Sequence, residues 1–205
     1  MWIKICGMTT LEAVSAALEA QVDAIGFVFA PSPRELTPGR AAELARPARG
    51  RLRCVAVTHH PTQQAVEEIL RVFGPDLLQT DAADFERLSL PGGLERLPVV
   101  RALESVPRQL PPRLLFEGPR SGAGVQSDWS GARKLARRTQ LVLAGGLTAD
   151  NVAAAIAAVG PFGVDVSSGV EAQPGVKSPV AIADFVAAVH SASARPAQNA
   201  QEDSR

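Results

Sequence analysis

Apolar runs of strand length alternate along this chain with longer segments of helical spacing. The short runs are rich in β-branched and other apolar residues, which is typical of buried strands. Strands are predicted at Trp2–Cys6, Ala24–Phe29, Leu52–Val57, Asp76–Gln79, Leu97–Arg101, Arg113–Glu117, Gln140–Ala144 and Phe162–Val166.

Alanine, leucine and charged residues at helical spacing follow most of the predicted strands. Helices are predicted at Thr9–Ala20, Thr37–Ala45, Thr62–Phe73, Thr148–Ala158 and Pro179–His190. Thr9 or Thr10 is the expected N-cap of the first helix, and Thr148 or Asp150 that of the fourth. The helices after the fourth and fifth strands are expected to be very short.

This repetition predicts an α/β protein in which eight parallel strands close into a single (β/α)8 barrel of near-minimal length. The alternative is a doubly wound open sheet, which usually has fewer strands and a glycine-rich fingerprint after the first one. Here that turn reads CGMTT, which lacks the fingerprint. We therefore expect one barrel domain over residues 1–190 and a disordered tail over residues 191–205, where the composition is small and polar.

The charge and cysteine content exclude several classes of partner. The chain has 21 basic and 21 acidic side chains among 205 residues, so it offers no basic field for nucleic acid or an anionic membrane. No signal-peptide pattern or membrane-spanning apolar stretch is visible, and only two cysteines occur. We expect a cytoplasmic monomer or homodimer that binds a small molecule.

In a barrel, functional residues gather where the strands end. The seventh and eighth strands end in Gly145, Gly146, Ser167, Ser168 and Gly169. Small residues let backbone amides approach a phosphate closely, although two tight turns alone would also favour them. Their position after the last two strands favours a phosphate site.

Alternation along the first strand places Lys4 and Cys6 inside the barrel, with Ile3 and Ile5 facing the helices. A thiol beside an ammonium group can act as a general base. On the eighth strand Asp165 also points inward, and it can pair with Lys4, which would weaken the influence of that ammonium group on the thiol. Both arrangements are compatible with the sequence.

Charged residues at three other strand ends are candidates for chemistry. Glu117 ends the sixth strand and is a candidate acid across the barrel mouth from Cys6, or else a solvated carboxylate. Arg34 follows the second strand and is a candidate clamp for a substrate carboxylate, or else a surface arginine. His59 and His60 lack cysteine or carboxylate partners at ligand spacing, so we expect no metal site there.

Four motifs carry a close resemblance to the phosphoribosylanthranilate isomerase family. They are KICGMT at 4–9, GFVFAPSPR at 26–34, LAGGLTADNV at 143–152 and VDVSSGVE with PGVKS at 164–178. The resemblance runs from Lys4 to about Val189. It implies a barrel enzyme of tryptophan biosynthesis that isomerises an aldose to a ketose by an Amadori rearrangement, without cofactor or metal.

The resemblance also implies roles for single residues. It makes Cys6 the general base, Glu117 the counterpart of the family's general acid, and Arg34 a ligand of the anthranilate carboxylate. It assigns phosphate binding to Gly145, Gly146, Ser167, Ser168 and Gly169, and it matches Asp165 to the family aspartate on the eighth strand. Lys4 and Gln79 are expected to contribute to substrate binding, and the small-residue loop at Ser121–Gly124 to lie beside the substrate.

Two departures from the family pattern stand out. The family's Gln-Leu-His-Gly at the fourth strand is here Gln-Thr-Asp-Ala, residues 79–82, and the family aspartate is here Glu117. Related phosphosugar isomerases and epimerases are the alternative enzymes, but they differ at the first strand or need metal-binding histidines. A catalytically silent phosphate-ligand binder on an inherited barrel is the alternative from another class.

Overall fold

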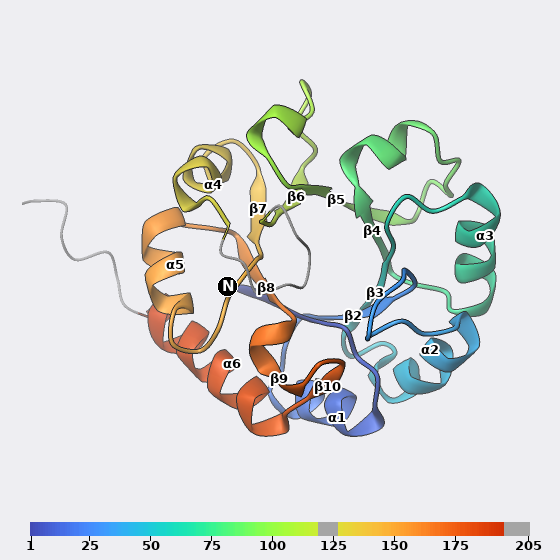
Figure 1. Ribbon diagram of the computed structural model, residues 1–205, viewed down its shortest axis with the longest axis horizontal. Coiled ribbons are helices and arrows are strands. Elements are labelled where there is room, and N and C mark those ends of the chain that lie inside the picture. The colour runs from blue at the N-terminus through green and yellow to red at the C-terminus, as the bar shows by residue number, and fades with distance from the viewer. Residues whose placement is uncertain (119–126, 195–205) are drawn as a thin grey trace, which may run out of the picture.

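The computed structural model describes residues 1–118 and 127–194. Eight parallel strands form a closed barrel in sequence order. They are β1 (Trp2–Cys6), β2 (Ala24–Val28), β3 (Arg53–Val57), β4 (Leu77–Asp81), β5 (Glu95–Val100), β6 (Arg113–Phe116), β7 (Gln140–Leu143) and β8 (Gly163–Val166). The ring closes where β1 pairs with β8, so the predicted (β/α)8 barrel is confirmed (Figure 1).

Helices surround the strands (Figure 1). The connections from β4 to β5 and from β5 to β6 contain only short 3-10 helices. The α-helices are α1 (Leu11–Glu19), α2 (Pro38–Ala45), α3 (Gln63–Val72), α4 (Trp129–Ala136), α5 (Val152–Val159) and α6 (Pro179–Ala194). The 3-10 helices are η1 (Arg46–Ala48), η2 (Ala82–Glu86), η3 (Leu103–Ser105) and η4 (Ser168–Val170). The short helices expected after the fourth and fifth strands are η2 and η3. Within the described residues, none of the helices has the length and apolar content to span a membrane.

Two apolar layers position the functional end of the barrel. Ile3 and Ile5 pack outward among the helices, as the alternation of β1 predicts. The barrel interior holds a smaller cluster that includes Val55, Leu97 and Leu115. Because the interior positions alternate with the exterior ones, the last inward residue of each strand faces the barrel mouth.

Several boundaries and elements differ from the sequence-based expectations. Helix α5 begins at Val152 with Asn151 as its N-cap, so the expected cap at Thr148 or Asp150 is wrong. The carbonyl of Thr148 accepts the amide of Val152, and the Asn151 side chain accepts the amide of Thr148 at 2.9 Å. Helix α6 continues to Ala194, while the rest of the predicted tail lies outside the described residues.

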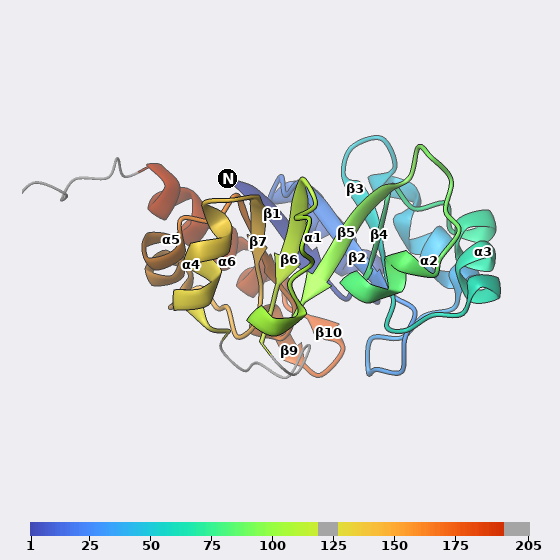
Figure 2. The same cartoon turned by 90° about the horizontal axis from the view of Figure 1, so that it is seen from above.

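A short hairpin, β9 (Glu171–Gln173) and β10 (Val176–Lys177), was not predicted. It turns at Gly175, whose positive φ of 83° favours glycine. Figure 2 shows the hairpin at the end of the barrel opposite to the N-terminus, which is the end where the parallel strands finish. The hairpin therefore adds side chains to the rim of the barrel mouth.

Candidate active site

A cavity of about 920 Å³ opens where the parallel strands end. Most of the residues that the sequence singles out line this one cavity, namely Cys6, Arg34, Gln79, Glu117, Gly145, Gly146, Asp165, Ser167 and Ser168. Lys4 and Gly169 are not among the residues that line it. The predicted loop at Ser121–Gly124 lies outside the described residues.

Lys4 and Asp165 form a buried ion pair at the closure of the barrel. The two residues are register partners on β1 and β8, and Nζ of Lys4 lies 2.9 Å from Oδ1 of Asp165. Burial by itself would lower the pKa of Lys4, but Asp165 and Cys6 outweigh it and raise that pKa. The pairing that the sequence left open is therefore present, and it keeps a fully buried ammonium group charged.

Cys6 is buried two residues after Lys4 on β1, on the same face of the strand. Burial raises the pKa of the thiol, although the charges of Lys4 and Lys177 act in the opposite direction. Gly26 on the neighbouring strand leaves room for this pair, because a β-carbon there would lie 3.0 Å from Sγ of Cys6 and 3.2 Å from Nζ of Lys4. The thiol therefore lies near two cations, but its burial outweighs them and disfavours the thiolate.

The turns after β7 and β8 lie against each other. Gly145 and Gly146 have positive φ angles of 91° and 65°, which favour glycine. Gly169 has a different reason to be glycine, because a β-carbon there would lie only 1.9 Å from the carbonyl oxygen of Leu147. Its missing side chain lets the two turns approach closely, as a shared phosphate site requires.

Hydrogen bonds fix these two turns in place. Nδ2 of Asn151 donates to the carbonyl of Gly146 at 2.7 Å. Oγ of Ser167 donates to the carbonyl of Cys6 at 3.1 Å, and Nζ of Lys177 donates to the carbonyl of Ser167 at 2.9 Å. The strand-eight turn is thus bonded to both the β1 end and the hairpin, and Lys177 adds a buried positive charge beneath it.

Arg34 is held by a residue that the sequence analysis did not select. Nε and Nη2 of Arg34 lie 2.6 and 2.8 Å from the two carboxylate oxygens of Glu171, and Lys177 lies 2.7 Å from Oε1. Burial would raise the pKa of Glu171, but the hydrogen bonds from Arg34 and Lys177 outweigh it and lower that pKa. Glu171 and Lys177 both belong to the motif at 164–178, but the contact of Glu171 with Arg34 depends on the hairpin and could not be inferred from the sequence.

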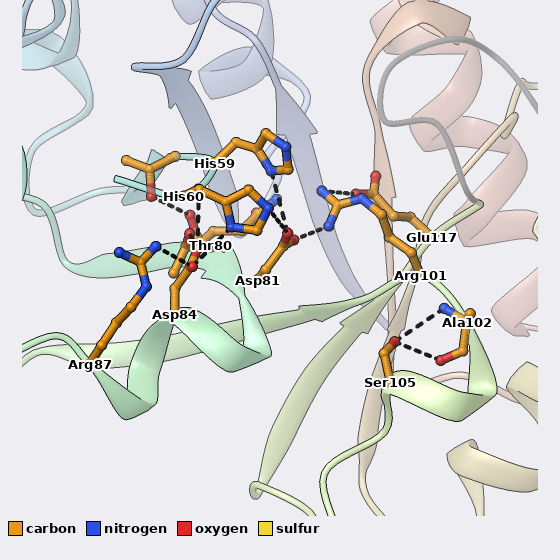
Figure 3. A network of polar contacts seen from close by, with 12 residues as sticks. His59, His60, Thr80, Asp81, Asp84, Arg87, Arg101, Ala102, Ser105 and Glu117 are labelled. Atoms are coloured by element: carbon orange, nitrogen blue, oxygen red, sulfur yellow. Dashed lines mark hydrogen bonds and ion pairs between the residues drawn. The ribbon is translucent and has the colours of Figure 1, made fainter. Parts of the chain in front are cut away.

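Glu117 is joined to the β4 end through Arg101. Nη2 of Arg101 lies 2.9 Å from Oε1 of Glu117, and Nη1 donates to Oδ1 of Asp81 (Figure 3). Asp81 stands where the resemblance led us to expect a histidine. The two departures from the family pattern are therefore connected physically, since a single guanidinium group contacts both residues.

His59 and His60 do have a carboxylate beside them, so that part of the expectation is wrong. Nδ1 of His59 and Nε2 of His60 lie 3.3 and 3.4 Å from Oδ2 of Asp81. Sequence spacing misses this contact because the pairing of β3 with β4 brings the residues together. Figure 3 shows both rings above the Asp81 carboxylate.

Asp84, in the middle of η2, anchors His60 from the other side. Its Oδ1 lies 3.0 Å from Nδ1 of His60, and Thr80 and Arg87 donate to the same carboxylate. Burial would raise the pKa of Asp84, but the hydrogen bonds from these three residues lower it to about 2. The group is therefore an ionised, nearly inaccessible carboxylate that fixes one side of the His60 ring.

Comparisons with known proteins agree with this geometry. The family model described as N-(5'phosphoribosyl)anthranilate (PRA) isomerase matches residues 3–188. The N-(5'-phosphoribosyl)anthranilate isomerase of Brucella canis is 39% identical, in a match covering 95% of this chain and 96% of that relative.

Solved structures extend the comparison. The structure of TrpF from Jonesia denitrificans is 36% identical, with a TM-score of 0.76 and coverage of 95% of this chain and 98% of that one. A phosphoribosyl anthranilate isomerase in complex with reduced 1-(o-carboxyphenylamino)-1-deoxyribulose 5-phosphate is 28% identical, with a TM-score of 0.75 and coverage of 93% and 99%.

Proposed function

This chain belongs to the N-(5'-phosphoribosyl)anthranilate isomerase family, and we propose that Cys6 and Glu117 are the base and the acid of its reaction. The enzyme converts N-(5'-phosphoribosyl)anthranilate to 1-(2-carboxyphenylamino)-1-deoxyribulose 5-phosphate in tryptophan biosynthesis. The observation that carries the proposal is that a thiol and a carboxylate from β1 and from the end of β6 line the same cavity.

In the proposed mechanism Glu117 donates a proton to the furanose oxygen, and the ring opens to a Schiff base. The Cys6 thiolate then removes the proton from C2, and the resulting enolamine tautomerises to the ketone. Lys4 and Lys177 favour the thiolate, while Asp165 holds Lys4 in its buried position. No electron is exchanged with another molecule, because the aldose carbon is reduced as C2 is oxidised.

Glu117 must carry a proton to act as the acid, although its ion pair with Arg101 stabilises the ionised form. Asp81 shares the same guanidinium group, so two carboxylates face one cation. The guanidinium group is therefore shared between two carboxylates, which weakens its stabilisation of the ionised form of Glu117 compared with a simple ion pair. We propose that Asp81 and Arg101 position Glu117 and adjust its protonation.

We propose that the phosphate of the substrate binds between Gly145, Gly146, Ser167 and Ser168, with Gly169 shaping the turn from behind. The close contact of the two turns and the buried charge of Lys177 support this placement.

We propose that Arg34 faces the anthranilate carboxylate, with its guanidinium plane fixed by Glu171. Gln79 lines the same cavity, and its buried Oε1 has no hydrogen-bond partner among the described residues. This oxygen can accept a hydrogen bond from a substrate hydroxyl.

We further propose that residues 1–190 act as one domain and that the enzyme works in the cytoplasm as a monomer or homodimer. Cys6 and Cys54 are both free thiols, which suits a reducing compartment. Light scattering of the purified protein tests the oligomeric state.

Consumption of phosphoribosylanthranilate, followed by its fluorescence, tests the catalytic assignment. Cys6→Ala and Glu117→Ala should each lower turnover by at least about 100-fold, the lower range of general acid–base contributions. Cys54→Ala and Glu68→Ala are matched controls, since Cys54 packs among the helices and Glu68 is exposed on α3. Turnover near the unmutated level in either test variant would reject that residue's role, while the family's reaction itself would stand on activity of the unmutated chain.

A further inference from the structure

We propose that His59, His60 and Asp81 form a binding site for a divalent transition-metal ion at the rim of the substrate cavity. The three side chains offer ligand atoms that all lie within 4.8 Å of one another. They come from the segment after β3 and from the end of β4, which are neighbouring strands of the barrel. This site is separate from the proposed chemistry of Cys6 and Glu117.

The distances fit tetrahedral coordination. Metal–ligand bonds of about 2.0–2.1 Å at tetrahedral angles place donor atoms about 3.3 Å apart. Oδ2 of Asp81 lies 3.3 Å from Nδ1 of His59 and 3.4 Å from Nε2 of His60. The His59 side chain is 54% exposed, so its ring can rotate to bring the third separation, between the two histidines, into range while Asp84 holds the His60 ring.

The contacts of His60 orient a lone pair toward this point. An oxygen of the Asp84 carboxylate lies 3.0 Å from Nδ1 of His60, so a proton on that nitrogen completes a hydrogen bond between them. In the neutral ring, Nε2 is then an acceptor that faces another acceptor, Oδ2 of Asp81. A cation between the two atoms resolves this opposition, and a carboxylate behind a metal-bound histidine is a common second contact in metal sites.

The neighbours of Asp81 also favour this geometry. Arg101 binds Oδ1 of Asp81, which leaves Oδ2 turned toward the histidines (Figure 3). Two imidazoles and one carboxylate suit Zn²⁺, Co²⁺, Ni²⁺ or Cu²⁺ better than Mg²⁺ or Ca²⁺, which prefer oxygen ligands. Water or a substrate oxygen would complete the coordination, because the site opens to solvent.

Metal binding at Oδ2 of Asp81 should affect the protonation of Glu117 through Arg101. A cation on Asp81 withdraws its negative charge, so Arg101 pairs more strongly with Glu117 and stabilises the ionised carboxylate. An ionised Glu117 cannot act as the acid. The structure therefore assigns the metal an inhibitory effect on turnover, and this consequence rests on the proposed role of Glu117.

Cobalt binding to the untagged full chain tests the site without measuring activity. Co²⁺ should produce a visible absorption band that saturates at one ion per chain, and Zn²⁺ should displace it. His59→Ala and His60→Ala should each weaken Zn²⁺ affinity in calorimetry by at least about tenfold, and Asp84→Asn by about 10–100-fold, as second contacts of metal ligands do. Circular dichroism of each variant verifies that it is folded.

Two variants serve as controls. His190→Ala removes the third histidine of the chain, which is exposed on α6, and should leave Zn²⁺ affinity unchanged. Cys6→Ser removes the thiol in the cavity and should also leave it unchanged. Absence of Co²⁺ absorption, or a folded His59→Ala variant with unaltered Zn²⁺ affinity, would overturn the proposed site.

Turnover with and without Zn²⁺ tests the coupling separately. Saturating Zn²⁺ should lower turnover severalfold in the unmutated chain and have no such effect in His59→Ala, which lies outside the proposed acid–base pair. Zn²⁺ that binds with unaltered turnover would overturn the inhibitory coupling while supporting the metal site. Failure of Cys6→Ala or Glu117→Ala to affect turnover would instead count against the proposed catalytic roles.

Discussion

Arg101 and Glu117 form an ion pair with 2.9 Å between Nη2 and Oε1 at the adjoining ends of β5 and β6. The same guanidinium group contacts Asp81 at the end of β4. The ends of three consecutive strands thus contribute Asp81, Arg101 and Glu117 to one row of charged side chains, of which Arg101 and Glu117 line the cavity. The position and protonation of the proposed acid depend on this row as much as on Glu117 itself.

Arg101→Lys should lower kcat by about tenfold with little change in KM. Lysine keeps the positive charge but cannot present two parallel donors to two carboxylates, so Glu117 and Asp81 lose their common orientation. Steady-state kinetics measure the effect. Arg96→Lys, on the exposed part of the same strand, is the control and should retain full activity. A large rise in KM with unaltered kcat would show that Arg101 binds substrate instead of positioning the acid.

Glu117→Asp should retain substantial activity, within about tenfold of the unmutated kcat. The shorter side chain restores the residue type that the family resemblance implies, but it moves the carboxylate by about one bond length, and such shifts can be costly. The same fluorescence assay applies. Complete loss of turnover would show that this cavity requires the longer glutamate side chain, whose carboxylate is positioned by Arg101.

The pH dependence of kcat/KM should follow the Cys6 thiol. Burial raises its pKa despite the opposing charges of Lys4 and Lys177, and only the thiolate can accept the C2 proton. Below that pKa the thiolate fraction rises about tenfold per pH unit, while the protonated fraction of Glu117 falls at the same rate, so kcat/KM should stay on a plateau and fall only above the raised thiol pKa. A profile that already falls between about pH 7 and about pH 8, below the ordinary thiol pKa of about 8.5, contradicts Cys6 as the base.

Alkylation by iodoacetamide gives an independent measure of the same thiol. Cys54 is an internal control, since it is fully buried among the helices and burial raises its pKa to about 11. Peptide mass analysis should find Cys6 labelled first, at a rate that rises with pH, and Cys54 only after unfolding. Equal labelling of both thiols would show that the cavity does not expose Cys6.

Asp165→Ala should lower the free energy of unfolding by about 3–5 kcal/mol, because it leaves the Lys4 ammonium group buried without its carboxylate. The double variant Lys4→Met with Asp165→Ala removes both charges and should recover most of that loss. Urea unfolding of the two single variants and the double variant measures the coupling. A double variant as unstable as the sum of the singles would show that the ion pair adds no interaction of its own.

The sequence predicts the barrel well because the fold repeats a simple pattern. All eight strands lie within two residues of their predicted ends, and the inward direction of Lys4 and Cys6 follows from alternation alone. Helix α4 was missed because it has only eight residues and includes Gly131, although Asp128 caps it by accepting the amide of Gly131. Short helices of this kind leave a weak periodic signal.

The candidate site was predictable as a set of positions but not as a set of contacts. Strand ends identified Cys6 and Glu117, since a barrel collects them at one mouth. The partners Glu171 and Arg101 could not be inferred, because Arg34 meets Glu171 across 137 residues and Asp81 meets Arg101 across 20. Pairings of charges between distant segments follow from packing, which a single sequence does not specify.

Gly169→Ala should weaken phosphate binding without unfolding the barrel. A β-carbon at residue 169 would lie 1.9 Å from the carbonyl oxygen of Leu147, which is backbone, so one of the two turns must move. We expect KM to rise by at least about tenfold, the loss of roughly one hydrogen bond to a charged group, with a smaller change in kcat. Inhibition by inorganic phosphate should weaken in parallel, because it depends on the same turns and not on Cys6 or Glu117.

Gly39→Ala is the matched control for this experiment. It lies at the start of α2, where an added β-carbon has open space, and alanine should be neutral or slightly stabilising there. If Gly169→Ala leaves both KM and phosphate inhibition unaltered, the phosphate does not depend on the contact between the β7 and β8 turns. If KM rises and phosphate inhibition weakens together, while thermal unfolding stays near that of Gly39→Ala, the close approach of the two turns at Gly169 shapes an anion site, because packing alone would tolerate the shift.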